Sequence, residues 1–140
     1  MEKIQFDSGV KAYRINGSGV LRFHPGDPNL YTRFLEAVDK FKALEQELAA
    51  ESLEEGQILT AMQAADKKMK ELLAWVFGEG NDFDKILEGV NLLAVADNGE
   101  RVITNLLLAL EPVLLEGAKR CAAVKTQQAQ RKAEARRAAQ

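Results

Sequence analysis

Two stretches of the chain repeat large apolar residues or alanine at alternating steps of four and three. The first contains Leu30, Phe34, Ala37, Phe41, Leu44 and Leu48. The second contains Ile58, Met62, Ala65, Met69, Leu72 and Val76. This spacing puts each set on one stripe of an α-helix, which is the pattern of helices that pack along a narrow seam. Residues 27–76 therefore predict a helical pair around which the rest of the chain is organised.

The seam is interrupted between the two stretches. Continuing the four-three count from Leu48 reaches Glu51 and Glu55, and Gly56 lies beside them. A single helix over residues 28–76 would be about 70 Å long, which is too long for a compact domain of this size. We therefore predict an antiparallel helical hairpin with its elbow near residues 50–57. One continuous helix is the alternative, because the register runs unbroken across the gap.

Short alternating segments precede the first helix. Ile4 and Phe6 alternate with polar neighbours, and residues 11–15 and 20–24 are two further runs joined through Asn16-Gly17. Asn-Gly favours a tight hairpin, because both residues tolerate positive φ. We expect a β-hairpin or a three-stranded meander, with one face covered by the helices.

Caps and breakers mark the later boundaries. Asp27 is placed to cap the first helix, and Gly78 stops the second near residue 77. A short helix over 83–88 and a fourth over 101–111 should follow. The apolar run 90–96 is compatible with a strand or a helix, since its length does not decide.

The C-terminal region changes character after Pro112, which either kinks the fourth helix or starts a fifth. Residues 125–140 have high helix propensity and no hydrophobic face, which predicts a frayed helix or a flexible segment. The fold class is therefore α+β: a β-hairpin or three-stranded meander on four to five mostly antiparallel α-helices, with a solvated C-terminal helical tail. We predict one domain over residues 1–124, followed by a basic, alanine-rich tail over 125–140.

The composition fits one domain in a reducing compartment. The 140 residues are 46% hydrophobic and 29% charged, and the formal net charge of -2 gives no global argument for nucleic acid or membrane. A single cysteine excludes an intramolecular disulfide. The N-terminus lacks the apolar run of a signal peptide, and no stretch reaches the ~18 apolar residues of a membrane span. We expect a cytoplasmic protein without a membrane partner.

Groups that carry catalysis or metal binding are sparse. The chain has one histidine, His24, and one cysteine, Cys121, which cannot together make a zinc site. Gly17 and Gly19 lack the lysine and following helix of a phosphate-binding loop. The acidic residues in 79–88 do not have the spacing of a calcium loop. We therefore predict that the protein is not an enzyme and uses no metal or cofactor.

Charge is distributed unevenly along the chain. The elbow is acidic, with Glu45, Glu47, Glu51, Glu54 and Glu55. The C-terminal end is basic, with Lys119, Arg120, Lys125, Arg131, Lys132, Arg136 and Arg137. These sets are either two solvated faces or surfaces that pair between subunits or with a partner. The tail could also bind nucleic acid, but it has no aromatic residue to stack on bases.

A resemblance to a known family begins at the turn before the first helix. The segment reads Phe23-His24-Pro25-Gly26-Asp27-Pro28-Asn29-Leu30-Tyr31-Thr32-Arg33-Phe34. It resembles a segment of the tail assembly chaperones of long-tailed phages and prophages, which often carry Phe-Asn-Pro-x-Asp-Pro-Asn before a helix with an Arg-Phe pair. His24 takes the place of the asparagine. Two further motifs, Val76-Phe77-Gly78 and Asp97-Asn98-Gly99, are similar to the same family, and the similarity is scattered over residues 20–115.

The resemblance implies a non-catalytic role. Members of this family coat the tape-measure protein, whose long apolar helical surface would otherwise aggregate, and then give way to tail-tube subunits as the tube polymerises. Many are made in a short form and a frameshifted longer form, and this chain would be the short one. The implied partners are the tape-measure protein and the tail-tube protein, in the cytoplasm of a bacterial host.

The apolar stripe along residues 30–76 is suited to self-association and to binding another amphipathic helix, so we expect a homo-oligomer. The candidate partner-contact residues are Leu30, Phe34, Phe41, Met62, Met69, Arg131, Lys132, Arg136 and Arg137. Two rival functions remain open. One is a generic oligomeric scaffold or adaptor that associates through the hairpin, and the other is a nucleic-acid-binding accessory protein that uses the basic tail.

Overall fold

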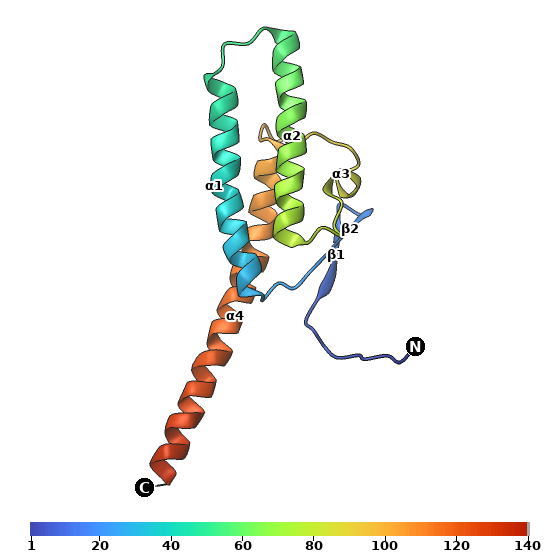
Figure 1. The fold of residues 1–140 in the computed structure, drawn as a ribbon. Helices are drawn as coiled ribbons and strands as arrows, with labels where there is room; N and C mark the ends of the chain where they lie inside the picture. The colour runs from blue at the N-terminus through green and yellow to red at the C-terminus, as the bar shows by residue number, and fades with distance from the viewer. Residues whose placement is uncertain (140) are drawn as a thin grey trace.

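The computed structural model describes residues 1–139, except for the side chains of Lys125 and Thr126. Figure 1 shows a long helical hairpin beside a small β-hairpin, with a fourth helix that runs behind the helical hairpin and continues past the domain. The fold is α+β, as the sequence predicts, with a C-terminal helical tail. The last residue of the predicted tail, Gln140, lies outside the described residues.

The β-hairpin consists of β1, Lys11–Ile15, and β2, Gly19–Phe23, which pair antiparallel with Tyr13 opposite Leu21. Asn16 and Gly17 both have positive φ, 50° and 88°, and the Ser18 N–H donates to the carbonyl oxygen of Ile15 at 3.3 Å. The Asn-Gly turn predicted from the sequence is therefore confirmed. The inward faces of both strands join the core, where the Tyr13 and Phe23 rings stack at 4.8 Å.

Of the two predicted alternatives, the described residues form the β-hairpin and not the three-stranded meander, because residues 1–10 form no strand. The turn at Asp7 and Ser8 is held by local hydrogen bonds. The Asp7 side chain accepts the Gly9 N–H at 2.9 Å, and the Ser8 side chain accepts the Val10 N–H at 3.3 Å. Gly9 adopts φ of 80°, and the segment before it leads away from the sheet (Figure 1). Hydrogen bonds within the turn replace the sheet ladder that the alternating pattern suggested.

A side-chain amide covers the outer edge of β2. The Asn81 Oδ1 accepts the Arg22 N–H at 3.0 Å, and the Asn81 Nδ2 donates to the Arg22 carbonyl at 2.8 Å. This side chain is buried and also donates to the Phe77 carbonyl at 3.0 Å. Asn81 therefore gives β2 the two hydrogen bonds that a neighbouring strand would supply, and it fixes the sheet to the end of the helical hairpin.

The helical hairpin is formed by α1, Pro28–Ala50, and α2, Glu55–Phe77. The predicted elbow is confirmed, because the chain leaves α1 after Ala50 and re-enters a helix at Glu55. The Asp27 side chain caps α1 by accepting the Asn29 N–H at 3.0 Å, and Arg33 donates from Nη2 to the Val76 carbonyl at 2.9 Å at the end of α2. Gly78, with φ of 113°, ends α2 as expected.

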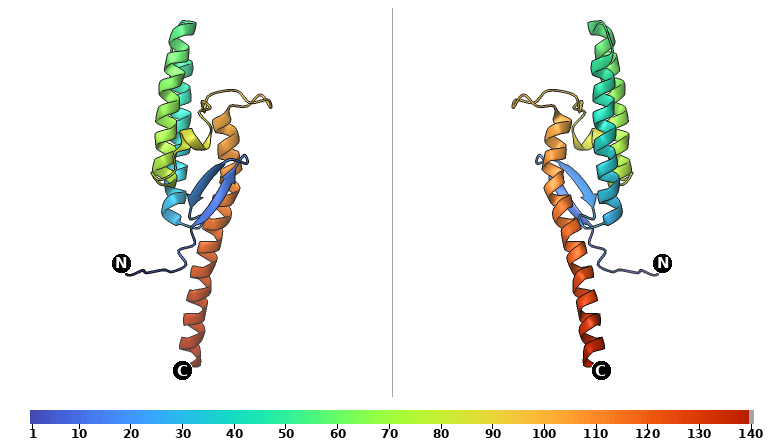
Figure 2. Two further views of the ribbon diagram at one scale, coloured as in Figure 1. Left: turned by 90° about the vertical axis from the view of Figure 1, so that its right-hand side faces the viewer. Right: turned by 90° about the vertical axis from the view of Figure 1, so that its left-hand side faces the viewer.

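A short helix and a turn-rich loop connect α2 to the last helix (Figure 2). The short helix, α3, spans Phe83–Ile86 and is capped by the Asp82 side chain, which accepts the Lys85 N–H at 3.2 Å. The apolar run 90–96 is neither a strand nor a helix: only Val95 forms an isolated bridge, with Arg101. Leu92 and Leu93 of this run are fully buried, so the segment contributes to the core without regular structure.

The last helix, α4, runs without a break from Val102 to Ala138. Of the two alternatives predicted at Pro112, a kink or the start of a fifth helix, the second does not occur in the described residues. Proline removes one backbone donor and crowds the preceding turn, but Pro112 is exposed and the helix is held on both sides of it by buried Leu110 and Leu114. Packing of these neighbours outweighs the local cost of the proline.

A mid-helix glycine allows α4 to touch the turn between β2 and α1. Gly117 is buried, and a Cβ built on it would lie 2.0 Å from the Pro25 carbonyl oxygen and 2.9 Å from the Gly26 nitrogen. No other residue type fits such a backbone-to-backbone approach. The motif that carries the family resemblance therefore packs directly on α4.

We predict that removing residues 125–140 leaves the melting temperature nearly unchanged. The described side chains from residue 127 to 139 are exposed except for half-buried Ala133, and this end of α4 projects beyond the domain in Figure 1. Exposed substitutions of this kind change stability by about 0.5 kcal/mol or less. Thermal melting followed by circular dichroism checks the prediction. A large drop would mean that the tail packs on the domain in solution.

Candidate partner-binding groove

The seam residues predicted to contact a partner lie within the molecule. Leu30, Phe34, Phe41 and Met69 are almost completely buried, and Met62 is half-buried. They pack α1 against α2 and form part of the single core that also includes the sheet and α4. A role for these side chains in partner binding stays a prediction, and it would require the hairpin to open.

The four basic residues predicted for the tail are exposed. Arg131, Lys132, Arg136 and Arg137 all lie on the projecting end of α4, and the acidic elbow lies at the opposite end of the molecule (Figure 1). The two charged regions therefore do not meet within one chain. Pairing between them, or with a partner, stays a prediction.

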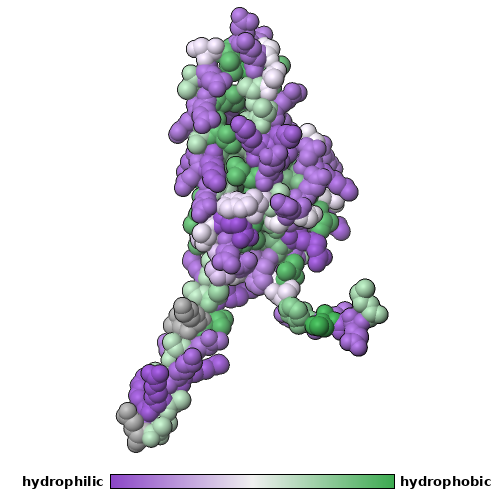
Figure 3. Space-filling model, in the orientation of Figure 1, coloured by the Kyte–Doolittle hydropathy of each residue, from purple (hydrophilic) through white to green (hydrophobic). Residues whose placement is uncertain are grey.

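A surface groove runs along the line where α1 and α2 meet. We call it the hairpin groove, and it is lined by Lys40, Ala43, Leu44, Glu47, Lys68, Glu71 and Leu72. Its volume is about 460 Å³. Figure 3 shows hydrophobic atoms along this line, with hydrophilic residues on both sides, on the face that α4 does not cover.

The walls of the groove are defined by one contact and by helix geometry. The Lys40 Nζ lies 5.1 Å from the centre of the Trp75 ring, so these two residues mark one level of the antiparallel pair. Glu47 on α1 and Lys68 on α2 lie two helical turns closer to the elbow than this level. Trp75 is 42% exposed, which is unusual for a tryptophan beside a core. The groove therefore combines an apolar floor with a charged rim, and Trp75 lies beside it in contact with Lys40.

This arrangement suits an amphipathic helix as a ligand. Half-buried Leu44 and Leu72 would contact the apolar face of a third helix, and the charged side chains would flank it, as in helix-in-groove recognition. The groove has no constellation of groups for covalent chemistry. Among the described residues, no cluster of three or more histidine, cysteine, aspartate or glutamate side chains could hold a metal ion.

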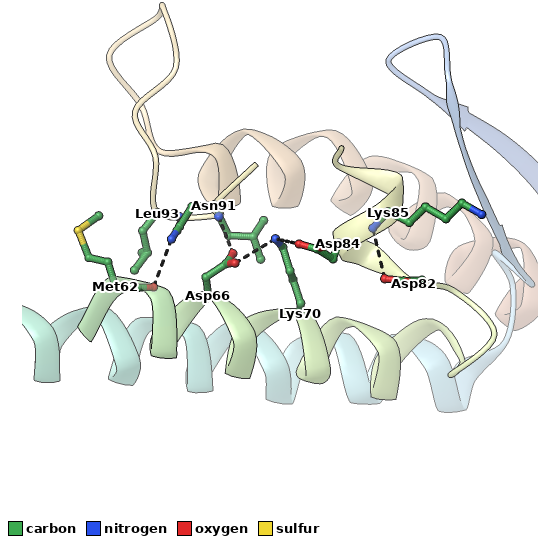
Figure 4. Close-up of polar contacts among 9 residues, drawn as sticks. Met62, Asp66, Lys70, Asp82, Asp84, Lys85, Asn91 and Leu93 are labelled. Carbon is green, nitrogen blue, oxygen red and sulfur yellow. Dashed lines mark hydrogen bonds and ion pairs between the residues drawn. The ribbon is translucent and has the colours of Figure 1, made fainter. Parts of the chain in front are cut away.

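The opposite side of α2 is fixed by a buried ammonium group (Figure 4). The Lys70 Nζ lies 2.9 Å from Asp66 on the same helix and 2.6 Å from Asp84 in α3. Asp66 also accepts the Leu92 N–H at 2.8 Å, and Asn91 donates to the Met62 carbonyl at 3.3 Å. These contacts tie α3 and the following loop to α2, and they hold in place the helix that forms one wall of the groove.

The protonation of Lys70 follows from these neighbours. Burial lowers the pKa of the ammonium group, but the hydrogen bonds to Asp84 and Asp66 and their negative charges raise it by more. The net effect is a pKa above the ordinary value of 10.5, so Lys70 stays charged at neutral pH.

A second cavity lies where the turn after β2 meets α4. Its volume is about 780 Å³, and its lining includes both the single histidine and the single cysteine, His24 and Cys121. The His24 Nδ1 accepts the Gly26 N–H at 3.0 Å, which fixes the ring within the turn. Cys121 is exposed and has no disulfide partner among the described residues. His24 therefore takes part in the turn that joins β2 to α1.

The sequence pattern predicts the helical hairpin but does not predict the hairpin groove. Seam periodicity identifies residues that face the other helix, whereas Lys40, Ala43 and Glu47 lie one position around α1 from that seam. Their spacing of three and four is a weak signal by itself, because exposed helix faces commonly alternate charge. The groove becomes visible only when the matching residues of α2 are placed beside them.

No protein-family model, curated protein or solved structure matches this chain. Within the described residues, no helix combines the length and the apolar character needed to cross a lipid bilayer.

Proposed function

We propose that the protein is a phage tail assembly chaperone that shields amphipathic helices of the tape-measure protein in the hairpin groove. It would then give way to tail-tube subunits in the cytoplasm of a bacterial host. The observation that carries the proposal is the open groove with its apolar floor and charged rim. The motif over residues 23–34, by which the chain resembles that family, supports it independently of the groove.

The mechanism requires reversible burial rather than catalysis. A tape-measure helix laid in the groove would cover Leu44, Leu72 and the exposed face of Trp75, which removes apolar surface of both partners from water. Because most of the lining residues are exposed to solvent, the helix can also leave when a tail-tube subunit competes for it. Short residence suits a transient assembly factor.

We predict that Leu72→Glu prevents binding to the tape-measure protein. The substitution places a charge on the apolar floor of the groove, and such central contacts contribute about 2 kcal/mol or more, or roughly 30-fold in affinity. The test is co-expression with a tape-measure protein of a long-tailed phage, which is a long helical protein, followed by affinity purification. The wild-type chain should recover that protein, and the variant should not.

Two controls separate binding from folding. Ala43→Glu changes an exposed residue of the same groove and should weaken binding without disturbing the core. Leu108→Glu makes the same chemical change as the test variant on α4, where Leu108 is 61% exposed, and binding should persist. Recovery of the long protein by both groove variants would contradict the proposed site, and no recovery by the wild-type chain would contradict the function.

A second candidate function is nucleic-acid binding by the tail. It is favoured by the four exposed basic side chains on the end of α4, Arg131, Lys132, Arg136 and Arg137. DNA binding that weakens steeply with salt and disappears when residues 125–140 are deleted would favour this function over the chaperone.

A further inference from the structure

The charges of the hairpin groove form a self-complementary pattern. Lys40 and Glu47 stand on the α1 wall, and Lys68 and Glu71 stand on the α2 wall. From the elbow toward the base, the α1 wall presents negative and then positive charge. The α2 wall presents the reverse order, positive and then negative. A cation on one wall is therefore matched by an anion on the other at both ends of the groove.

These four side chains have no ion-pair partner within the part of the chain that the structure describes. All four are exposed, and Lys40 contacts only the ring of Trp75 in the described interactions. The groove thus presents two positive and two negative groups that are available to a ligand with the opposite pattern.

We propose that a second copy of this chain covers the groove, with the two hairpins face to face about a twofold axis. If the axis runs along the helices, Lys40 meets the partner's Glu71, and Glu47 meets the partner's Lys68. If the axis runs across the helices, Lys40 meets the partner's Glu47, and Lys68 meets the partner's Glu71. Unlike charges oppose each other in both arrangements, as a closed isologous dimer requires.

The size of the face is sufficient for such a dimer. Each helix of the hairpin has 23 residues, which corresponds to a length of about 35 Å. With the two axes about 9 Å apart and each helix about 10 Å across, the face of one hairpin is a little under 20 Å wide and covers roughly 600 Å². Two such faces bury about 1,200 Å² in total, which reaches the lower limit of specific protein–protein interfaces. Leu44, Leu72 and Trp75 then lie inside a four-helix arrangement.

The dimer does not rest on the proposed function, because it follows only from the charge pattern and the size of this chain's own groove. The two proposals share one surface, so a tape-measure helix would have to displace the second copy. Self-association and recovery of the long partner protein are separate measurements, and either can fail while the other succeeds.

The test exchanges charges in the groove and measures mass by sedimentation velocity or by light scattering. Glu47→Lys with Glu71→Lys makes all four groups basic, and Lys40→Glu with Lys68→Glu makes all four acidic. Like charges then oppose each other in either arrangement, so each variant alone should dimerise about 100-fold more weakly than the wild-type chain. An equimolar mixture of the two variants should restore the dimer.

A control variant makes the same change in net charge as the basic groove variant, but outside the groove. Glu100→Lys with Glu111→Lys alters two exposed residues of the last loop and α4, and it should dimerise as the wild-type chain does. Circular dichroism establishes that each variant is folded. A monomeric wild-type chain would overturn the proposal. So would groove variants that dimerise normally, or a mixture that stays monomeric.

Discussion

Replacing Gly117 by alanine should lower the melting temperature by about 10 °C, which corresponds to a loss of about 3 kcal/mol of unfolding free energy. The added methyl carbon would lie 2.0 Å from the Pro25 carbonyl oxygen, and backbone cannot move aside as the end of a side chain can. The turn after β2 must therefore separate from α4, or α4 must shift. Thermal melting followed by circular dichroism measures the effect.

The sign of this effect is informative, because alanine is the better helix former. In a helix without the close contact, Gly117→Ala would stabilise the protein by roughly 0.5–1 kcal/mol. Gly56→Ala is the matched control: Gly56 lies in the first turn of α2, and a Cβ there would meet nothing within 4 Å. The control should melt at or slightly above the wild-type temperature. A stabilised Gly117→Ala variant would refute the packing of α4 on the turn.

Replacing Lys70 by methionine should cost about 2–3 kcal/mol of unfolding free energy. Removing one partner of a buried ion pair typically costs about 3–5 kcal/mol. The cost expected here lies below that range because water can reach Asp84. Its side chain is 67% exposed, whereas that of Asp66 is only 15% exposed and would keep an uncompensated charge. Urea unfolding measures the change.

Matched variants locate the cause of this loss. Lys67→Met removes a neighbouring exposed ammonium group and should be nearly neutral. Adding Asp66→Asn to Lys70→Met should recover part of the stability, because the amide oxygen still accepts the Leu92 N–H while the unpaired charge is gone. Equal stability of Lys70→Met and the wild-type chain would contradict the described network.

The pH dependence of this contribution has a defined direction. The pKa of Lys70 is raised in the folded state above its ordinary value of 10.5. Its stabilisation is therefore complete below about pH 10.5 and is lost as the pH rises through the higher pKa of the folded state. Titration of Lys70 should therefore leave the stability difference between the wild-type chain and Lys70→Met constant from neutral pH to about pH 9. At higher pH the difference should shrink.

Local signals were sufficient for most boundaries of the fold. Asn16-Gly17, Asp27 and Gly78 each act within a few residues, so their roles could be predicted from the sequence. The elbow was predictable because charged residues occupy the seam positions Glu51 and Glu55. The period of three and four also identified which helix faces are buried.

Features that depend on residues far apart in the chain could not be predicted. No local pattern distinguishes Lys70 from a surface lysine, and only the placement of α3 brings Asp84 to it. Pro112 was expected either to kink the fourth helix or to start a fifth, and the buried leucines on both sides of it hold α4 together as one helix. Gly117 could not be recognised from the sequence, because the group that requires a glycine there is the Pro25 carbonyl, 92 residues earlier in the chain. The groove required both helices to be placed before its rim could be recognised.

The burial along the hairpin has a further consequence for dynamics. Fully buried residues of α1 end at Phe41 and those of α2 begin at Ala65, so the turns next to the elbow are held only by half-buried side chains such as Leu48. Backbone amide protons in those turns should exchange with deuterium through local openings that leave the core intact. The end of the hairpin that reaches furthest from the domain is thus the part that can splay and reclose without global unfolding.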